Sequence, residues 1–277
     1  MSIILREMGL AELDDVLDWA AAEGWNPGLA DAAPFFAADP KGFFLAELDE
    51  QPVAAISVVN HDADFAFLGL YICRPEWRGH GIGLALWNHA LRHAGDRSVG
   101  LDGVAAQQAN YARSGFVRMG SSTRFTGALE GGRSRGVRRA TSGDFEALHL
   151  LDRQACGFAR KPFLREWTAC APSRLTVLHE GPAGIDGFAT IRLCREGGKI
   201  GPIIAPNAEQ AVDLARAAVA ELPVGPVSID LPEASREFAA RLVESGFHPG
   251  FTTARMSRGP SPRHSPHMQA IASMELG

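Results

Sequence analysis

The sequence Arg78-Gly79-His80-Gly81-Ile82-Gly83 is the stretch around which the rest of the chain is organised. It follows an apolar run over residues 65–72, typical of a buried strand, and it opens a helical pattern that extends to Gly95. Three glycines in five residues allow tight turns and leave no side chains between the backbone N–H groups and a ligand. Unpaired N–H groups and the helix dipole make the start of a helix a site for phosphate. The stretch therefore predicts a pyrophosphate-binding loop between a strand and a helix, with an ordinary strand-to-helix turn as the alternative.

The glycine spacing excludes two common nucleotide-binding motifs. A P-loop ends in Gly-Lys-Ser/Thr, whereas Leu84 and Ala85 follow Gly83. A dinucleotide fingerprint, Gly-x-Gly-x-x-Gly, would need its third glycine at position 84 or 86, and both positions are Leu. The pattern that fits is Arg-x-x-Gly-x-Gly, with Arg78, Gly81 and Gly83 at its fixed positions. This spacing resembles the acyl-CoA loop of the GNAT N-acetyltransferase superfamily, which wraps the pyrophosphate of coenzyme A.

The order of predicted elements supports this resemblance over residues 1 to about 130. Apolar periodicity and turn residues predict β-α-α-β-β-β-α-β-α-β-β, in which residues 116–127 form a final pair of short strands. In the helix after the loop, one face carries Ile82, Leu86, Ala90 and Ala94. The order is that of the GNAT fold. The expected fold class is therefore α/β (α+β), with a mixed, mostly antiparallel sheet flanked by helices.

The resemblance implies which residues hold the cofactor, acetyl-CoA. In the GNAT fold the strand before the loop separates from its neighbour and offers backbone N–H groups to the pantetheine arm and the thioester oxygen. The implied contacts are Tyr71, Ile72, Cys73, Arg78, Gly79, His80, Gly81, Ile82, Gly83, Leu84 and Asn110. The family often has an asparagine after the next strand, where this chain has Val104. One cofactor contact of the family is therefore missing from the pattern.

Tyr111 is the candidate catalytic acid. It stands four residues before Gly115, and the family pattern Tyr-x-x-x-Gly-Phe places this phenol near the sulfur of the thioester. A phenol with a pKa near 10 can protonate a thiolate as the thiolate leaves. The alternative is a tyrosine that only packs in the core.

The sequence does not identify the general base or the acceptor. The strand over residues 65–72 contains no carboxylate, although many relatives carry a glutamate there. The candidates for the base are Glu23, His61, Asp62 and Asp64, or a chain of water molecules. By resemblance, Trp25 and Asn26 stand where the family builds its acceptor pocket, and His61 is a further expected substrate contact. Phe35 fits either the pocket or the core.

The second half of the chain repeats the first. Ser114-Gly115-Phe116 recurs as Ser245-Gly246-Phe247, and an arginine follows each at the same distance, Arg124 and Arg255. Val99-Gly100-Leu101-Asp102 is echoed by Val227-Ser228-Ile229-Asp230. Between the copies, the Gly- and Arg-rich stretch 131–137 is typical of a linker. The sequence predicts two tandem GNAT-like domains, 1–130 and 138–277, the second with a closing strand after residue 268.

The second copy lacks the phosphate loop. Residues 199–209 retain a strand followed by a helix, with Asn207 as a candidate N-cap, but without a glycine cluster. Glu209 would repel a phosphate at the start of that helix. The second copy is therefore expected to shape a substrate pocket, an interface or the stability of the first copy, while the first copy binds the cofactor.

Composition narrows the class of protein. The 277 residues carry a net charge of −5, which argues against nucleic-acid binding. The apolar stretches are too short to span a membrane. The four cysteines lack Cys-x-x-Cys spacing, and His264 and His267 lack further ligands beside them, so a metal site is not expected. We expect a cytoplasmic protein and leave open whether it forms a homodimer.

The predicted function is an acyltransferase that moves an acetyl group from acetyl-CoA to a primary amine of a small molecule, by direct attack within a ternary complex. The chain resembles a group of double-domain acetyltransferases through Gly-Trp-Asn-Pro, Leu-Asp-Gly-Val and the closing Ser-Met-Glu-Leu-Gly. The alternatives are a regulatory protein that binds acyl-CoA without catalysis, and a protein N-acetyltransferase.

Overall fold

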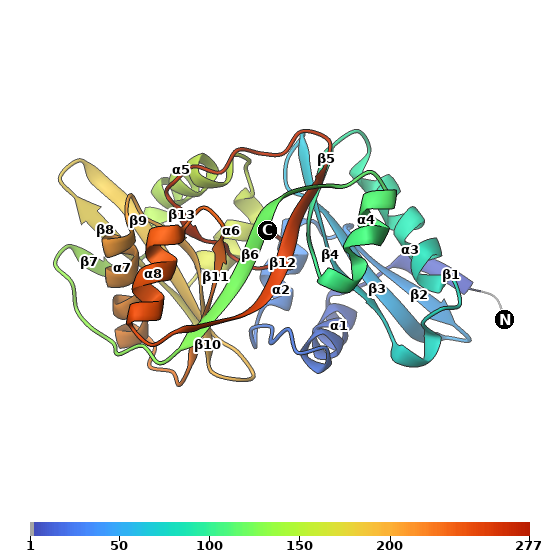
Figure 1. Ribbon diagram of the computed structural model, residues 1–277, viewed down its shortest axis with the longest axis horizontal. Coiled ribbons are helices and arrows are strands. Elements are labelled where there is room, and N and C mark those ends of the chain that lie inside the picture. The colour runs from blue at the N-terminus through green and yellow to red at the C-terminus, as the bar shows by residue number, and fades with distance from the viewer. Residues whose placement is uncertain (1–2) are drawn as a thin grey trace.

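The protein forms one continuous sheet of 13 strands, described over residues 3–277 of a computed structural model (Figure 1). The first half contributes β1 (Ile3–Glu7), α1 (Leu10–Ala22), α2 (Ala32–Ala38), β2 (Phe43–Leu48), β3 (Gln51–Asn60), β4 (Phe65–Cys73), α3 (Ile82–Ala90), β5 (Ser98–Gly103), α4 (Gln108–Arg113) and β6 (Val117–Gly127). The second half contributes β7 (Val137–Arg139), α5 (Phe145–Cys156), α6 (Lys161–Thr168), β8 (Arg174–Gly181), β9 (Gly184–Leu193), β10 (Gly198–Ile204), α7 (Ala208–Glu221), β11 (Val227–Pro232), α8 (Arg236–Glu244), β12 (His248–Arg258) and β13 (Met268–Ala270).

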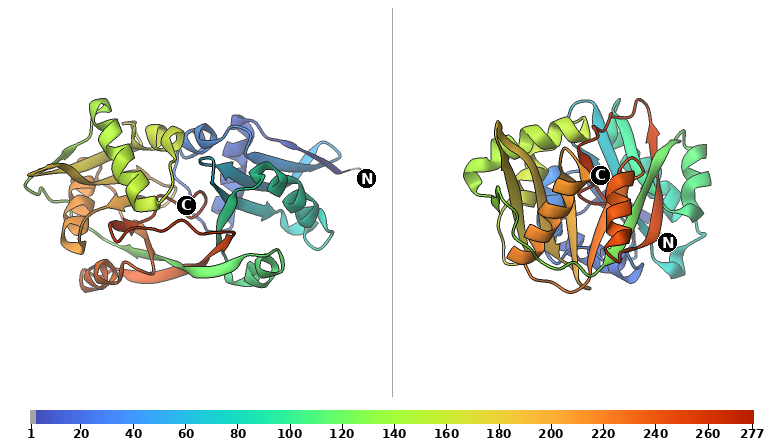
Figure 2. Two further views of the ribbon diagram at one scale, coloured as in Figure 1. Left: turned by 90° about the horizontal axis from the view of Figure 1, so that it is seen from above. Right: turned by 60° about the vertical axis from the view of Figure 1, so that its left-hand side comes forward.

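The two halves exchange their last long strands. β12 lies between β5 and β6, and β6 lies between β12 and β11, so each half completes its sheet with a strand from the other. β12 pairs antiparallel with β5 from Ala254↔Gly103 to Arg258↔Val99, and β6 pairs antiparallel with β11 from Ser122↔Pro232 to Gly127↔Val227. Figure 2 shows β6 in green and β12 in red-orange crossing from one lobe to the other. We call this arrangement the strand exchange.

The strand exchange corrects one expectation from the sequence. Residues 116–127 do not form a pair of short strands, because residues 117–127 are the single strand β6. The place that a second strand would take beside β5 is filled by β12. The linker 131–137 lies between the two sequence copies, but the strands of both copies belong to one continuous sheet. The linker lies against α7, where the Gly132 N–H donates to the Arg216 carbonyl at 3.1 Å.

A gap in the sheet arises where β4 separates from β5. The two strands pair in parallel from Phe65↔Ser98 to Leu68↔Leu101, and β4 then continues to Cys73 without β5. A register shift against β3 and a positive φ of 46° at Leu70 mark a bulge at this point. The backbone groups of residues 69–73 that face β5 are therefore available to a ligand.

The helices cover the sheet as their apolar periodicity predicts. Ile82, Leu86 and Ala90 are buried against the sheet, which confirms the predicted inner face of α3, and Ala94 is buried in the 3₁₀ turn that follows the helix. Burying each large aliphatic side chain contributes about 1.5–3 kcal/mol to folding. Phe35 on α2 is also fully buried and packs on Phe163 and Trp167 of α6, at ring-centroid distances of 6.5 and 5.9 Å. Phe35 therefore belongs to the core between the halves.

Over residues 3–277, no helix combines the length and the apolar character needed to cross a membrane.

Candidate active site

The glycine loop has the backbone that its sequence predicts. Gly79 and Gly81 adopt left-handed φ values of 83° and 78°, and Gly81 is the N-cap of α3. A Cβ on either glycine would meet open space. Glycine is therefore required at both positions by the left-handed backbone conformation and not by a lack of space. Gly83 is needed for a different reason, because a Cβ there would lie 2.7 Å from the Tyr71 hydroxyl. The first N–H groups of α3 therefore face an open cleft.

Arg78 is anchored at the mouth of this cleft. Its Nε donates to the Cys73 carbonyl at 2.8 Å, and its guanidinium forms an ion pair with the Glu23 carboxylate. Both side chains of the pair are substantially exposed, so the pair contributes little to stability. The guanidinium is available to exchange the carboxylate for a phosphate.

Two adjoining spaces meet at Tyr71, which lines both. The outer cleft, of 550 Å³, is lined by the glycine loop, the end of β4 and the residues Glu23, Trp77, Ala106 and Phe251. The inner cavity, of 70 Å³, lies between β4, β5, β6 and β12. The two spaces share the residues Trp25, Tyr71, Val104, Gln107 and Phe251. A thioester that enters along the outer cleft would therefore reach the inner cavity at Tyr71.

The structure brings most of the residues expected at the cofactor site to the outer cleft. Those that line it are Tyr71, Ile72, Cys73, Arg78, Gly79, Gly81, Gly83 and Leu84. His80, Ile82 and Asn110 do not line it. His80 packs on Trp77, Ile82 is buried against the sheet, and the Asn110 amide donates to the Gln107 side chain at 2.6 Å.

Tyr111 lies at the inner cavity. Its ring stacks on Trp87 with centroids 5.3 Å apart, and Trp87 also contacts Tyr71 at 5.3 Å. Burial and the nearby Tyr71 raise the pKa of Tyr111 above its ordinary value, and burial raises the pKa of Tyr71 to about 12. Both phenols therefore stay protonated at neutral pH, which is the state that a proton donor needs.

Of the residues expected at the acceptor site, the structure brings only Trp25 to the two spaces. The Asn26 amide is held by the Glu196 backbone, donating to its carbonyl at 2.8 Å and accepting from its N–H at 3.1 Å. His61 is buried, and its Nε2 donates to the Leu276 carbonyl at 2.9 Å. His61 therefore holds the end of the chain, and we do not retain it as a substrate contact.

Sequence reasoning missed the contribution of the second half to the inner cavity. Phe251 and Thr253 on β12, and Met274 and Glu275 near the end of the chain, line it together with Asp102 and Arg124. The repeat gave no sign of this, because it assigned residues 138–277 to a separate copy. The one local signal is the closing Ser-Met-Glu-Leu-Gly, whose Glu275 is a carboxylate within an apolar stretch.

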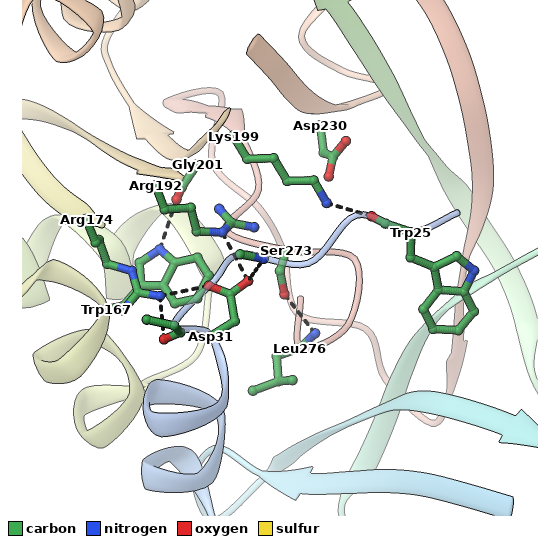
Figure 3. A network of polar contacts seen from close by, with 12 residues as sticks. Trp25, Asp31, Trp167, Arg174, Arg192, Lys199, Gly201, Asp230, Ser273 and Leu276 are labelled. Carbon is green, nitrogen blue, oxygen red and sulfur yellow. Dashed lines mark hydrogen bonds and ion pairs between the residues drawn. The ribbon is translucent and has the colours of Figure 1, made fainter. Parts of the chain in front are cut away.

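Buried charges fix the Trp25 segment in place (Figure 3). The Trp25 carbonyl accepts hydrogen bonds from Lys199 Nζ at 2.9 Å and from Arg124 Nη1 at 3.0 Å. Arg124 also pairs with both carboxylate oxygens of Asp230, at 2.7 and 2.8 Å. A few residues further along, Asp31 accepts from Arg174 and Arg192. Since these donors belong to β6, β8, β9 and β10, both halves position the wall of the inner cavity.

The corresponding gap of the second half is filled by the chain itself. β10 and β11 pair in parallel only from Gly198↔Val227 to Ile200↔Ile229. Beyond that point β13 pairs with β10 at Ile203↔Ala270 and Ile204↔Met268. Asn207 caps α7 by accepting from the Gln210 N–H at 2.9 Å, as the sequence predicts. With β13 in the gap and no glycine loop before α7, the second half has no counterpart of the outer cleft.

Comparisons with known proteins agree with this architecture. Residues 10–120 match the model of the acetyltransferase (GNAT) family, and residues 148–271 match that of an acetyltransferase (GNAT) domain. A holothin acyltransferase of Pseudoalteromonas sp. (strain SANK 73390) is 36% identical over 276 residues, which cover 98% of this chain and 94% of that protein.

Solved structures share the fold. A putative acetyltransferase from Pyrococcus horikoshii superposes with a TM-score of 0.80 at 20% identity, covering 99% of this chain and 96% of its own. A tandem GNAT protein from the clavulanic acid biosynthesis pathway superposes with a TM-score of 0.65 at 15% identity, covering 94% of this chain and 100% of its own. From the family matches and the extent of the holothin acyltransferase similarity, we conclude that the chain belongs to the GNAT superfamily as a tandem member and is an acyltransferase.

Proposed function

We propose that the protein transfers an acetyl group from acetyl-CoA to a primary amine of a small molecule, by direct attack within a ternary complex. The observation that carries this proposal is that the outer cleft and the inner cavity share Trp25, Tyr71 and Phe251 in their walls and so adjoin each other. Donor and acceptor can then be bound at the same time, one in each space. Holding both reactants in contact supplies much of the rate enhancement in such a transfer.

The residues around the outer cleft fit coenzyme A. The start of α3 and the Arg78 guanidinium would hold the pyrophosphate. The free backbone groups of β4 after Leu68 would pair with the pantetheine arm and polarise the thioester carbonyl. Tyr111 would protonate the sulfur as the thiolate leaves. Each role uses a group that the structure leaves accessible at the cleft or cavity.

The size of the inner cavity favours a short acyl group. With a volume of 70 Å³ it has room for an acetyl group beside a small nucleophile, whereas a long acyl chain would need the walls to move. This volume supports acetyl-CoA over longer donors.

The enclosure of the inner cavity favours a small acceptor over a protein. Phe251, Met274 and Glu275 from the second half cover it, so an extended peptide would have to displace them. The similarity to a holothin acyltransferase points in the same direction.

The test is a steady-state assay of coenzyme A release, with product mass measured in parallel. Acetyl-, butyryl- and octanoyl-CoA are each offered with benzylamine, tyramine, cadaverine and a lysine-containing peptide. The expected result is N-acetylation of a small amine, fastest with acetyl-CoA, and intersecting lines in double-reciprocal plots. Parallel lines with a covalent acetyl-enzyme would contradict direct attack. Faster transfer to the peptide, or a preference for octanoyl-CoA, would contradict the proposed substrates.

A further inference from the structure

The attacking amine must lose a proton, and none of the bases expected from the sequence lies in the inner cavity. Glu23 is paired with Arg78 at the mouth of the outer cleft. Asp62 lies in the turn before β4 and does not line the inner cavity. Its carboxylate accepts hydrogen bonds from the backbone N–H groups of Asp64, Phe65 and Ala159 at 2.9–3.0 Å. Asp64 lies in the same turn, outside the cavity. His61 is committed to the Leu276 carbonyl.

The inner cavity itself contains two carboxylates, and only one of them is free. Asp102 accepts from Arg255 with both oxygens, at 2.9 and 2.7 Å. Glu275 is only 4% exposed, and over residues 3–277 its carboxylate receives no hydrogen bond and forms no ion pair. The cations that balance its charge act from a distance, so both carboxylate oxygens remain open to a ligand in the cavity. Glu275 is therefore the carboxylate of the inner cavity that is open to a hydrogen bond from an acceptor amine.

The backbone around Glu275 is held at several fixed points. The Ile271 N–H donates to the Asp230 carbonyl at 3.0 Å, just after β13 leaves β10. The Leu276 carbonyl accepts from His61, and the Leu276 N–H donates to Ser273 Oγ at 3.1 Å. The Gly277 carbonyl accepts from Arg160. Because hydrogen bonds hold the backbone on both sides of Glu275, its side chain projects from a fixed backbone.

The backbone of Glu275 crosses β4 at Gly69, the glycine at the start of the gap between β4 and β5. A Cβ on Gly69 would lie 1.9 Å from the Glu275 carbonyl oxygen, so the two backbones are in direct contact. Gly69 follows Leu68, the last residue of β4 that pairs with β5. Glu275 therefore enters the inner cavity at the point where β4 begins to separate, next to the backbone groups that face the thioester.

From this geometry we infer that Glu275 is the general base of the first-half site, delivered by the end of the second half. The inference rests on the proposed function. The Glu275 carboxylate takes one proton from the acceptor ammonium, and the neutral amine attacks the thioester carbonyl. When the C–S bond breaks, Tyr111 gives its phenol proton to the sulfur, and the amide nitrogen gives its remaining excess proton to the Tyr111 phenolate. Glu275 then releases its proton to solvent, so one ammonium ion and one acetyl-CoA yield one amide, one coenzyme A and one proton.

Other charged groups lie near Glu275. They are Arg124 on β6, Lys199 on β10, Arg192 on β9, Asp230 on β11, and the Asp102–Arg255 pair of β5 and β12, with Tyr71 and Tyr111 across the cavity. A readout that follows protonation is therefore needed besides a rate at one pH.

The test compares the isosteric variant Glu275→Gln with the unmodified protein, using acetyl-CoA and the amine of the panel that is acetylated fastest. The expected result is a fall in kcat of roughly 10²–10⁴-fold. KM for acetyl-CoA and the melting temperature should remain close to those of the unmodified protein. The acidic limb of the pH profile of kcat should be replaced by a rate that rises steadily with pH, as the fraction of neutral amine rises. Glu275→Asp should keep the acidic limb at a reduced rate, and Glu130→Gln, an exposed control, should change neither.

Two results would overturn the assignment in distinguishable ways. If the unmodified protein acetylates a panel amine and Glu275→Gln does so within threefold with the same acidic limb, Glu275 is not the base and the proposed function stands. If the unmodified protein acetylates none of the amines, the proposed function fails and the role of Glu275 fails with it. Thermal denaturation and coenzyme A binding of Glu275→Gln separate a loss of chemistry from a loss of folding.

Discussion

The Glu275 carbonyl oxygen lies directly against Gly69 of β4, so close that a methyl group on Gly69 would come within 1.9 Å of it. The same relationship recurs in the second half, where a Cβ on Gly201 of β10 would lie 2.2 Å from the Ile271 carbonyl. The segment of residues 271–275 therefore crosses β10 at Gly201 and β4 at Gly69. In the second half it continues from β13, which fills the gap, and in the first half it leaves the gap open.

Replacing Gly69 with alanine should displace this segment. Because the contact is to backbone, it cannot be relieved by rotating a side chain, and overpacking of this kind costs about 1–3 kcal/mol. Gly69→Ala should lower the free energy of unfolding by that amount and reduce kcat by moving Glu275. Gly225→Ala is the matched control, since a Cβ there meets nothing within 4 Å. Equal stability and activity of the two variants in denaturant titrations and assays would contradict the role of Gly69.

Coenzyme A should bind to one site per chain, and Arg78 should dominate its affinity. A hydrogen bond between charged groups contributes about 1.5–3 kcal/mol, so Arg78→Ala should weaken binding roughly 10- to 100-fold. Glu23→Gln should strengthen binding by a few-fold at most, because it frees Arg78 from an exposed ion pair. Isothermal titration calorimetry measures both, with Arg74→Ala as a control outside the cleft. A stoichiometry of two would mean that β13 does not block the second half.

Removing the Tyr111 hydroxyl should slow the reaction without weakening cofactor binding. Tyr111→Phe retains the stacking on Trp87 and loses the proton donor, so kcat should fall roughly 10²-fold or more while the Kd for coenzyme A is unchanged. Tyr71→Phe provides the comparison, because the Tyr71 hydroxyl faces Gly83 of the loop and its removal should alter cofactor binding more than kcat. An unchanged kcat in Tyr111→Phe would exclude the acid role.

Acid should destabilise the protein through His61. Burial and the nearby Arg160 lower the pKa of His61 to about 4 from 6.5, so the folded state keeps it neutral while the unfolded state takes up a proton. Stability is then fully present above pH 6.5 and is lost as the pH falls toward 4, by up to roughly 3 kcal/mol.

The variant His61→Gln tests this, since its amide can still donate to the Leu276 carbonyl and cannot take up a proton. The slope of unfolding free energy against pH should be shallower in His61→Gln between pH 6.5 and 4, and unchanged in the exposed control His248→Gln. Identical slopes in all three proteins would place the acid sensitivity elsewhere.

Neither half should fold alone. A fragment of residues 1–137 lacks β12, which leaves β5 and β6 without the strand that joins them. We expect no cooperative unfolding transition and no coenzyme A binding from this fragment. Co-expression with residues 138–277 should restore both, as judged by calorimetry and size-exclusion chromatography. Cooperative unfolding of the isolated fragment would show that the strand exchange is dispensable.

Local sequence signals predicted the backbone of the glycine loop and the buried face of the helix that follows it. The glycines at 79, 81 and 83 encode a backbone shape by themselves, and the apolar face of α3 follows from helical periodicity alone. Tyr111 was identified from its spacing to Gly115, and its position at the inner cavity agrees with that interpretation. These features depend on residues that are neighbours along the chain.

The acceptor side could not be predicted, because it depends on contacts between distant residues. β6 and β12 follow the same Ser-Gly-Phe tripeptide, so their sequences do not reveal which sheet edge each one joins. His61 lies beside the turn at Asp62 and looks like a solvated residue, yet Leu276 buries it. Glu275 carries no local motif, and only the folded path of residues 271–277 brings it to β4.

The strand exchange also bears on how this chain can evolve. A duplicated enzyme usually frees its second copy to drift or disappear, but here the copy without the loop supplies the strand that closes the other copy's sheet and the walls of its reaction chamber. Loss of the second copy would destroy the first. Under the proposed function, substitutions that change the acceptor should fall in β12 and in residues 274–275, which belong to the second half and line the inner cavity.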